Sequence, residues 1–199
     1  MAQTEITVQI FDKIENVIKK IESLGFSWKD TFTGKDFYYS TLEKEKISKA
    51  SYKELLDTSI IVREFHKKST DKLQTMLVHK KKVLDEKGRV VGEDKTSLSV
   101  ESSKLAQKLL SSAGLENWMS LCQQNNFFVS GEVTVIIGTV EGLDGTFVEI
   151  EEYESIKNKS EKEKFEILCE FVSSLGFETG GDYSCKKIYM LYNKKNNKQ

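Results

Sequence analysis

The chain alternates between segments with an apolar residue at every third or fourth position and segments with one at every second position. The first kind is typical of a helix that buries one face. Three segments have this spacing, and each stops at a glycine, with the endings ESLGF, SSAGL and SSLGF. A glycine just past the last apolar residue commonly ends a helix. We therefore expect three main helices, at residues 14–24, about 103–113 and 160–175.

The starts and faces of these helices can also be predicted. A capping box places an acidic or amide residue three positions after the residue that caps the helix. Two pairs have that spacing: Asp12 with Glu15, and Ser160 with Glu163. The apolar stripe of the second helix consists of Leu105, Leu109, Leu110 and Ala113. We expect this stripe to face the core.

Segments with period-two alternation lie between the helices and predict strands. They are EITVQI (5–10), SIIVREF (59–65), QTMLVHKKK (74–82), TSLSVE (96–101), FFVSGEVTVII (127–137) and CKKIYMLY (185–192). The turns DEKG (85–88) and EGLDG (141–145) are suited to hairpins. The pattern therefore predicts an α+β domain with about eight antiparallel strands.

One face of these strands is apolar and the other is polar or charged. The charged face carries Glu5, Arg63, Lys80, Glu101, Glu149 and Glu151. In an open sheet, such a face meets water. In a closed barrel with helices packed outside, the same pattern produces a charged lumen. The alternation alone leaves both interpretations open.

The segment GTFVEIEEYE bears most directly on function. As a strand, it places Val148 and Ile150 on one face, and Phe147, Glu149, Glu151 and Tyr153 on the other. Carboxylates that gather in a closed site raise one another's pKa unless a cation lies between them. Mg²⁺ accepts such oxygens and completes its coordination with water and phosphate. Lysine and arginine on neighbouring strands would bind phosphate oxygens. A charged lumen therefore suits a metal-bound polyphosphate.

Composition narrows the remaining function classes. The 30 basic and 31 acidic residues nearly cancel, which argues against a nucleic-acid or membrane-surface partner. No apolar run approaches the roughly 20 residues of a membrane span, and the start lacks signal-peptide features, so we expect a cytoplasmic protein. Cys122, Cys169 and Cys185 are spaced neither as a disulfide framework nor as a zinc site. We expect one domain over residues 1–199, with a polar tail at about 193–199.

Several motifs resemble the CYTH superfamily, the triphosphate tunnel proteins that include class IV adenylyl cyclases and thiamine triphosphatases. They are DFYYSTL, LVHKK and above all VTVIIGTVEGLDGTFVEIE, within a likeness that extends from about residue 4 to 192. The most specific part, VEGLDGTFVEIE, is similar to the family's late hairpin with its Glu-x-Glu pair. The resemblance implies a closed or nearly closed eight-stranded antiparallel β-barrel, or tunnel, with helices outside.

The resemblance also implies a ligand, metals and site residues. The ligand would be a nucleoside triphosphate or polyphosphate, bound with Mg²⁺ or Mn²⁺. Glu149 and Glu151 would hold the metal, together with Glu5, while Arg63 and Lys80 would hold the phosphates as catalytic residues. Further candidates for the tunnel lining are Glu101, Lys82 and Tyr189. Relatives are often dimers, so a homodimer stays open.

The chain departs from the family pattern at several positions. In the first strand, Thr7 and Gln9 replace the second acid and the lysine of Glu-x-Glu-x-Lys. Of the Arg-x-Arg strand only Arg63 survives. A Lys-x-Arg pair and an aspartate of later strands fall on Gln123, Asn125 and Gly138. Lysines without a counterpart in the family pattern could substitute, namely Lys82, Lys95, Lys186 or Lys187.

Three hypotheses therefore stand. The first is a metal-dependent enzyme, either a cyclase that converts ATP to cyclic AMP and pyrophosphate or a triphosphatase. The second is a catalytically inactive binding module that keeps the fold and has lost phosphate-anchoring residues. The third, a ligand carrier unrelated to the family, predicts an apolar interior, and the charged face argues against it. His66 and His79 are isolated and suggest neither a catalytic triad nor a zinc site.

Overall fold

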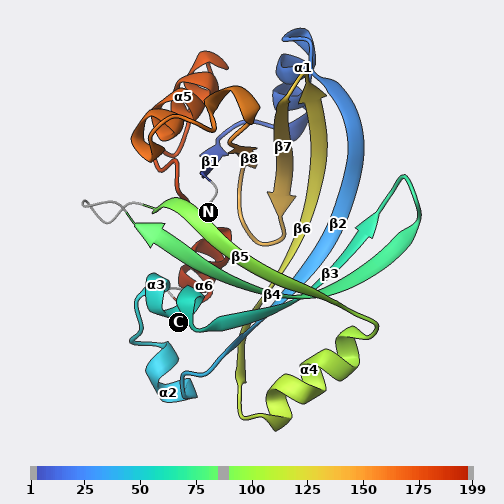
Figure 1. Ribbon diagram of the computed structural model, residues 1–199, viewed down its shortest axis with the longest axis vertical. Coiled ribbons are helices and arrows are strands. Elements are labelled where there is room, and N and C mark those ends of the chain that lie inside the picture. Colours follow the sequence, from blue (N-terminus) through green and yellow to red (C-terminus); the bar gives the residue numbers. More distant parts are fainter. Residues whose placement is uncertain (1–3, 85–89, 197–199) are drawn as a thin grey trace.

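Eight strands form one antiparallel sheet that curls into a tunnel (Figure 1). The computed structural model describes residues 4–84 and 90–196, without the side chains of residues 44, 52, 82–84 and 90–93. The strands are β1 (Glu5–Ile10), β2 (Ser27–Ser40), β3 (Ser59–Lys67), β4 (Lys72–Leu84), β5 (Val90–Val100), β6 (Glu116–Ser130), β7 (Val133–Val140) and β8 (Thr146–Glu151). Their order in the sheet is β1-β8-β7-β6-β2-β3-β4-β5.

The edge strands β1 and β5 approach each other, although no ladder of hydrogen bonds joins them in the described part of the chain. The helices are α1 (Ile14–Ser23), α2 (Lys44–Ile47), α3 (Tyr52–Asp57), α4 (Ser103–Ser112), α5 (Glu161–Ser174) and α6 (Lys187–Asn196), with a short 3-10 turn at Glu154–Ile156. The predicted α+β tunnel is therefore confirmed. No helix among the described residues is long and apolar enough to cross a membrane.

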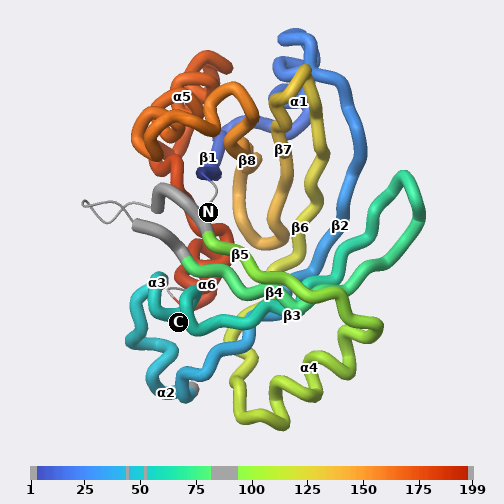
Figure 2. Tube along the Cα trace, in the orientation of Figure 1, coloured from blue at the N-terminus to red at the C-terminus, as the bar shows by residue number. Residues whose placement is uncertain are grey.

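Alternation along the strands divides the side chains between an outer and an inner face. Outward residues of β1, β7 and β8, such as Val8, Ile137 and Val148, pack under α1 and α5. On another part of the sheet, Val62 packs under α4. Figure 2 shows α1 and α5 at one end of the molecule and α4 at the other. The helices α1, α4 and α5 thus cover the apolar outer face of the sheet, and the polar inner face lines the tunnel.

Of the segments predicted as strands, 185–192 is wrong, because it contributes to α6, and 127–137 contains the end of β6, a turn and the start of β7. Cys185, Ile188 and Leu191 are buried and lie three positions apart, which is helical spacing. They pack on inward residues such as Tyr38 and Leu121. The helix α6 therefore fills one end of the tunnel. The apolar and polar residues of this short segment also fit a period of two, which misled the prediction.

The strand β2 was not predicted from alternation. Two consecutive residues of this strand, Tyr38 and Tyr39, point to opposite faces of the sheet, yet both are buried. Tyr38 contacts the inner cluster around α6, and Tyr39 packs under α4. A strand covered on both faces shows no alternation to detect.

Two predicted details of the helices are wrong and one is confirmed. The capping residue of α1 is Lys13, which provides no side-chain cap, and Asp12 instead accepts hydrogen bonds from the Lys13 backbone and from Asn16. The capping box at the start of α5 is present. In α4, Leu110 of the predicted stripe is buried and packs with Ala106 on the sheet, whereas Leu105 and Leu109 are both 66% exposed.

Three further predictions concern Tyr153 and the two hairpin turns. Tyr153 lies past the end of β8 and packs on the outer core, so it does not share the face of Glu149. The turn at 85–88 lies outside the described residues. The turn at 141–145 joins β7 to β8 as expected.

A buried ion pair connects α5 to the residue that follows β8. Oε2 of Glu152 lies 2.8 Å from Nζ of Lys164, whose side chain is 7% exposed. The same oxygen accepts a hydrogen bond from the Thr4 backbone at 3.1 Å. Burial alone would raise the pKa of Glu152, but the hydrogen bonds from Lys164 and Thr4 outweigh it and lower this pKa below 4.5.

The Glu152→Gln variant is expected to make stability less sensitive to acid. A carboxyl group whose pKa is lowered in the folded state stabilises the fold above its ordinary pKa, and this contribution is lost as the pH falls through the folded value. Urea unfolding at pH values on both sides of 4.5 measures the slope of the free energy of unfolding against pH. Lys164→Met should flatten the same slope, because it removes the ammonium group that lowers the pKa. A slope as steep as the wild type's in both variants would contradict this assignment.

Candidate functional site

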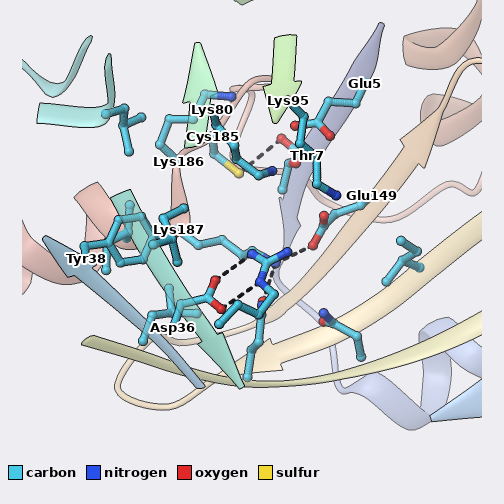
Figure 3. Close-up of a pocket in the computed structure, with 18 of the residues that line it drawn as sticks. Glu5, Thr7, Asp36, Tyr38, Lys80, Lys95, Glu149, Cys185, Lys186 and Lys187 are labelled. Atoms are coloured by element: carbon cyan, nitrogen blue, oxygen red, sulfur yellow. Dashed lines mark hydrogen bonds and ion pairs between the residues drawn. The ribbon is translucent and has the colours of Figure 1, made fainter. Parts of the chain in front are cut away.

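A cavity of about 360 Å³ lies inside the tunnel (Figure 3). We call it the charged cavity, because its described lining includes five basic side chains and four carboxylates. The basic residues are Arg63, Lys80, Lys95, Lys186 and Lys187, and the acidic ones are Glu5, Asp36, Glu149 and Glu151. They come from β1 to β5, from β8 and from the start of α6. The charged face of the strands is therefore a lumen and not a solvated sheet surface.

The structure brings together Glu5, Arg63, Lys80, Glu149 and Glu151 in the charged cavity. The three remaining sequence candidates lie differently. Glu101 is exposed just past the end of β5, and Tyr189 stacks on Tyr192 along α6. Neither is part of the described cavity lining. The side chain of Lys82 lies outside the described residues.

Two like-charged pairs meet where the edges of the sheet approach. On β1 and β8, Glu5 lies directly opposite Glu151. On β4 and β5, Lys80 lies directly opposite Lys95. Side chains opposite each other on neighbouring strands are within interaction distance, and like charges there are unfavourable unless they are neutralised. Since β1 and β5 approach each other, the acidic pair and the basic pair line the same cavity, where Figure 3 shows Lys95 beside Glu5.

Arg63 is held by a carboxylate that sequence reasoning missed. Its Nε and Nη2 donate to the two oxygens of Asp36 at 2.8 and 2.6 Å. Burial opposes the charge of Arg63, but Asp36 outweighs it, with a further contribution from Glu149, and the pKa of Arg63 is raised. Asp36 is opposite Arg63 in the β2–β3 register. The DFYYSTL motif contains this aspartate, but its pairing with Arg63 depends on the register of β2, a strand that alternation did not predict.

Lys187 reaches the charged cavity from the start of α6. The segment before this helix is hydrogen-bonded to the edge strand β1. The backbone N–H of Cys185 donates to the backbone carbonyl oxygen of Thr7 at 3.1 Å. Lys187 then donates to Gln123 at 2.8 Å and forms an ion pair with Glu149. Sequence reasoning named Lys187 only as a substitute anchor, because it has no counterpart in the family's strand motifs.

Gly138 leaves room for a neighbouring amide. A Cβ built on this glycine would overlap with the side chain of Asn125 on β6 and would lie 2.7 Å from the backbone oxygen of Gln124. The close approach of β6 therefore leaves no room for a side chain at position 138, and the Asn125 amide lines the charged cavity.

The carboxylates of the charged cavity fit a metal ion only in part. Among the described residues, no group of three or more His, Cys, Asp or Glu side chains is arranged to hold one. Glu149 forms an ion pair with Lys187, and Glu5 and Glu151 lie directly opposite each other on β1 and β8, so two carboxylates of the lining are adjacent in the sheet. Mg²⁺ commonly uses one or two carboxylates and takes its other ligands from substrate phosphates and water. The pair therefore fits a metal that arrives with a phosphate ligand.

Comparisons with known proteins concern the fold. No family model matches the chain, and no curated protein matches its sequence significantly. Among solved structures, the PH1819 protein from Pyrococcus horikoshii OT3 has 18% identity and a TM-score of 0.71, covering 96% of this chain and 99% of its own. A candidate adenylate cyclase from Vibrio parahaemolyticus has 12% identity and a TM-score of 0.64, covering 97% and 99%.

A third similar structure is a candidate adenylyl cyclase from Hippeastrum whose dominant activity is that of a triphosphatase. It has 12% identity and a TM-score of 0.58, and the match covers 96% of this chain and 95% of that one. Identities this low show a shared fold and no more.

Proposed function

The chain has the fold of the CYTH triphosphate tunnel proteins, and we propose that its charged cavity binds a triphosphate ligand together with Mg²⁺ or Mn²⁺. The observation that carries this proposal is the meeting of the Glu5–Glu151 pair with the Lys80–Lys95 pair in one cavity. A polyphosphate and its metal need both signs of charge at close range. Solved structures of the same fold include proteins described as adenylate cyclase and triphosphatase.

The basic side chains would bind the phosphate oxygens. A triphosphate carries about four negative charges near neutral pH, and each hydrogen bond to a charged group contributes about 1.5–3 kcal/mol. Lys80 and Lys95 lie opposite each other on β4 and β5 and line the same cavity as the acidic pair, and Lys186 adds a third ammonium group to the lining. Arg63 uses Nε and Nη2 on Asp36, so its Nη1 is the group that would contact phosphate.

The acidic pair would hold the metal. When bound there, Mg²⁺ or Mn²⁺ supplies charge neutralisation and polarises the phosphorus–oxygen bonds. The same residues serve two reactions, hydrolysis by an attacking water and cyclisation by the ligand's own ribose 3′-hydroxyl. In both, the lysines and Arg63 would stabilise charge that develops on the phosphate oxygens.

A second candidate function is binding without turnover. Thr7 replaces an acid that the family uses, and Gln9 turns away to donate to the Asp144 carbonyl at 2.7 Å. Glu149 is occupied by Lys187. These replacements favour a module that keeps the charged cavity and lacks part of the catalytic machinery.

Thermal unfolding with ligand and metal tests the proposal. A ligand present at about 100 times its Kd stabilises the fold by about 2.7 kcal/mol. We expect tripolyphosphate or ATP to raise the Tm in the presence of Mn²⁺, and to raise it less when EDTA removes the metal. An unchanged Tm with every triphosphate would contradict the proposal. Release of phosphate, or of pyrophosphate with cyclic AMP, then separates an enzyme from a binding module.

A further inference from the structure

The helix α4 has apolar residues on its exposed side as well as on the side that packs on the sheet. Ala106 and Leu110 are buried and pack beside Val62. Leu105 and Leu109 are exposed, and residues four positions apart in a helix are neighbours on its surface. A helix that packs on one neighbour needs one apolar side. The second apolar side of α4 is therefore left largely uncovered by the described part of the chain.

Leu98 extends this apolar surface onto the sheet. It lies on β5 directly opposite Leu77 of β4, and Leu77 belongs to the cluster that packs under α4. Leu98 is 63% exposed, and β5 leads directly into α4 (Figure 1). We call Leu98, Leu105 and Leu109 the leucine patch. Single exposed leucines are common on protein surfaces, whereas a group of them is typical of a binding surface.

Hydrogen bonds fix the rotation of α4 about its own axis. Tyr39 Oη donates to Gln107 Oε1 at 3.2 Å, and Gln107 Nε2 donates to Ser103 Oγ at 3.0 Å. Because Tyr39 lies on β2, these contacts hold one side of the helix against the sheet. The helix cannot roll to bury Leu105 and Leu109 without breaking them. The exposure of the leucine patch is therefore built into the way α4 packs.

The charged residues of α4 are basic. Lys104 and Lys108 directly precede the two leucines of the helix, so the lysines form a second row beside them, and both lysines are exposed. The helix contains no acidic residue, and Glu101 lies before its start. A second copy of the chain would bring the same two ammonium groups to a contact between two α4 helices, where like charges repel. The net charge of −1 provides no general attraction to an anionic membrane.

We propose that the leucine patch, with Lys104 and Lys108 beside it, docks an acidic amphipathic helix of another protein. Apolar side chains of that helix would cover the three leucines, and its Asp or Glu side chains would meet the two lysines. Amphipathic helices bind protein surfaces in this way through apolar anchors at helical spacing. None of these five residues lines the charged cavity, so the docking surface is separate from the proposed triphosphate site.

Selection from a phage-displayed library of random helical peptides tests this proposal. Phage are selected on the wild-type protein and on the Leu105→Gln/Leu109→Gln variant, in which glutamine keeps the helix propensity of leucine. We expect the peptides enriched on the wild type to have apolar residues at helical spacing and a net negative charge. Their affinity, measured by fluorescence anisotropy, should fall about tenfold or more in the leucine variant. Lys104→Glu/Lys108→Glu should weaken the same peptides and favour basic ones.

The matched control is Leu24→Gln, which changes an exposed leucine at the end of α1, far from α4 (Figure 2). Its peptide affinity should equal that of the wild type. Because every substituted side chain is exposed, all three variants should keep the Tm of the wild type and its shift with ATP and Mn²⁺. A wild-type protein that shows no such shift would contradict the proposed function and leave this inference standing.

Four outcomes would overturn the inference. Two of them concern the selection: no peptide enriched on the wild type relative to the leucine variant, or enrichment of neutral or basic peptides. The third is a wild-type dimer in analytical ultracentrifugation that the leucine variant dissociates, which would assign the leucine patch to a second copy of the chain. The fourth is binding to vesicles of anionic phospholipid that the same variant abolishes, which would assign the patch to a membrane surface.

Discussion

The Glu5→Gln/Glu151→Gln double variant is expected to lose at least about a hundredfold in Mn²⁺-dependent triphosphate affinity. Changes to groups that merely support a metal ligand already cost about 10–100-fold, and this variant removes two facing carboxylates. Glutamine keeps the size of each side chain and removes its charge. Calorimetric titration of ATP with Mn²⁺ present measures the effect.

A matched control is Glu116→Gln, an exposed carboxylate at the start of β6 outside the cavity lining, and its affinity should equal that of the wild type. The carboxylates would not be metal ligands if the double variant bound ATP as tightly as the wild type with Mn²⁺ present. A loss of equal size in the presence of EDTA would likewise assign them a role that does not involve metal.

The Arg63→Met variant is expected to lower the free energy of unfolding by about 3–5 kcal/mol, the usual cost of leaving one member of a buried ion pair alone. The reason is Asp36, whose side chain is 2% exposed while that of Arg63 is 24% exposed. Without the guanidinium group, this carboxylate stays in the tunnel wall with its main partner gone. Urea unfolding at neutral pH gives the value.

The Asp36→Leu/Arg63→Met double variant should recover most of that loss, because a buried pair can often be replaced by apolar residues at little cost. It should still bind triphosphate more weakly than the wild type, since the phosphate contact from Arg63 is absent. A single variant as stable as the wild type would show that Asp36 does not depend on Arg63. A double variant as unstable as the single one would locate the cost in packing and not in charge.

Local patterns predicted most of the tunnel wall, because a wall with one apolar and one polar face repeats every two residues. The strands β1, β3 and β4 were located in this way, and the alternation assigned Glu149 and Glu151 to the same face. The method failed where burial does not alternate. In β2 both Tyr38 and Tyr39 are covered, and in α6 a short segment fits two periods.

The candidate site was only partly visible in the sequence. Residues on regular strands, such as Glu5 and Lys80, could be assigned to the polar face from the alternation, and the family resemblance implied that this face lines a tunnel. Asp36 and Lys187 could not, since the first depends on strand register and the second on a helix that fills the tunnel end. The cavity lined by Phe32, Phe65 and Phe127 was missed for a related reason, because these residues come together only when β3, β2 and β6 lie side by side. Sequence spacing does not contain that order.

The most direct measurement is a crystal structure of the protein soaked with Mn²⁺ and a non-hydrolysable nucleoside triphosphate. Anomalous scattering identifies the metal independently of the ligand. The account predicts a manganese peak in the tunnel beside the carboxylates of Glu5 and Glu151, with phosphate density extending toward Lys80 and Lys95. Manganese or nucleotide bound only on the outside of the barrel, with the tunnel containing water alone, would contradict it.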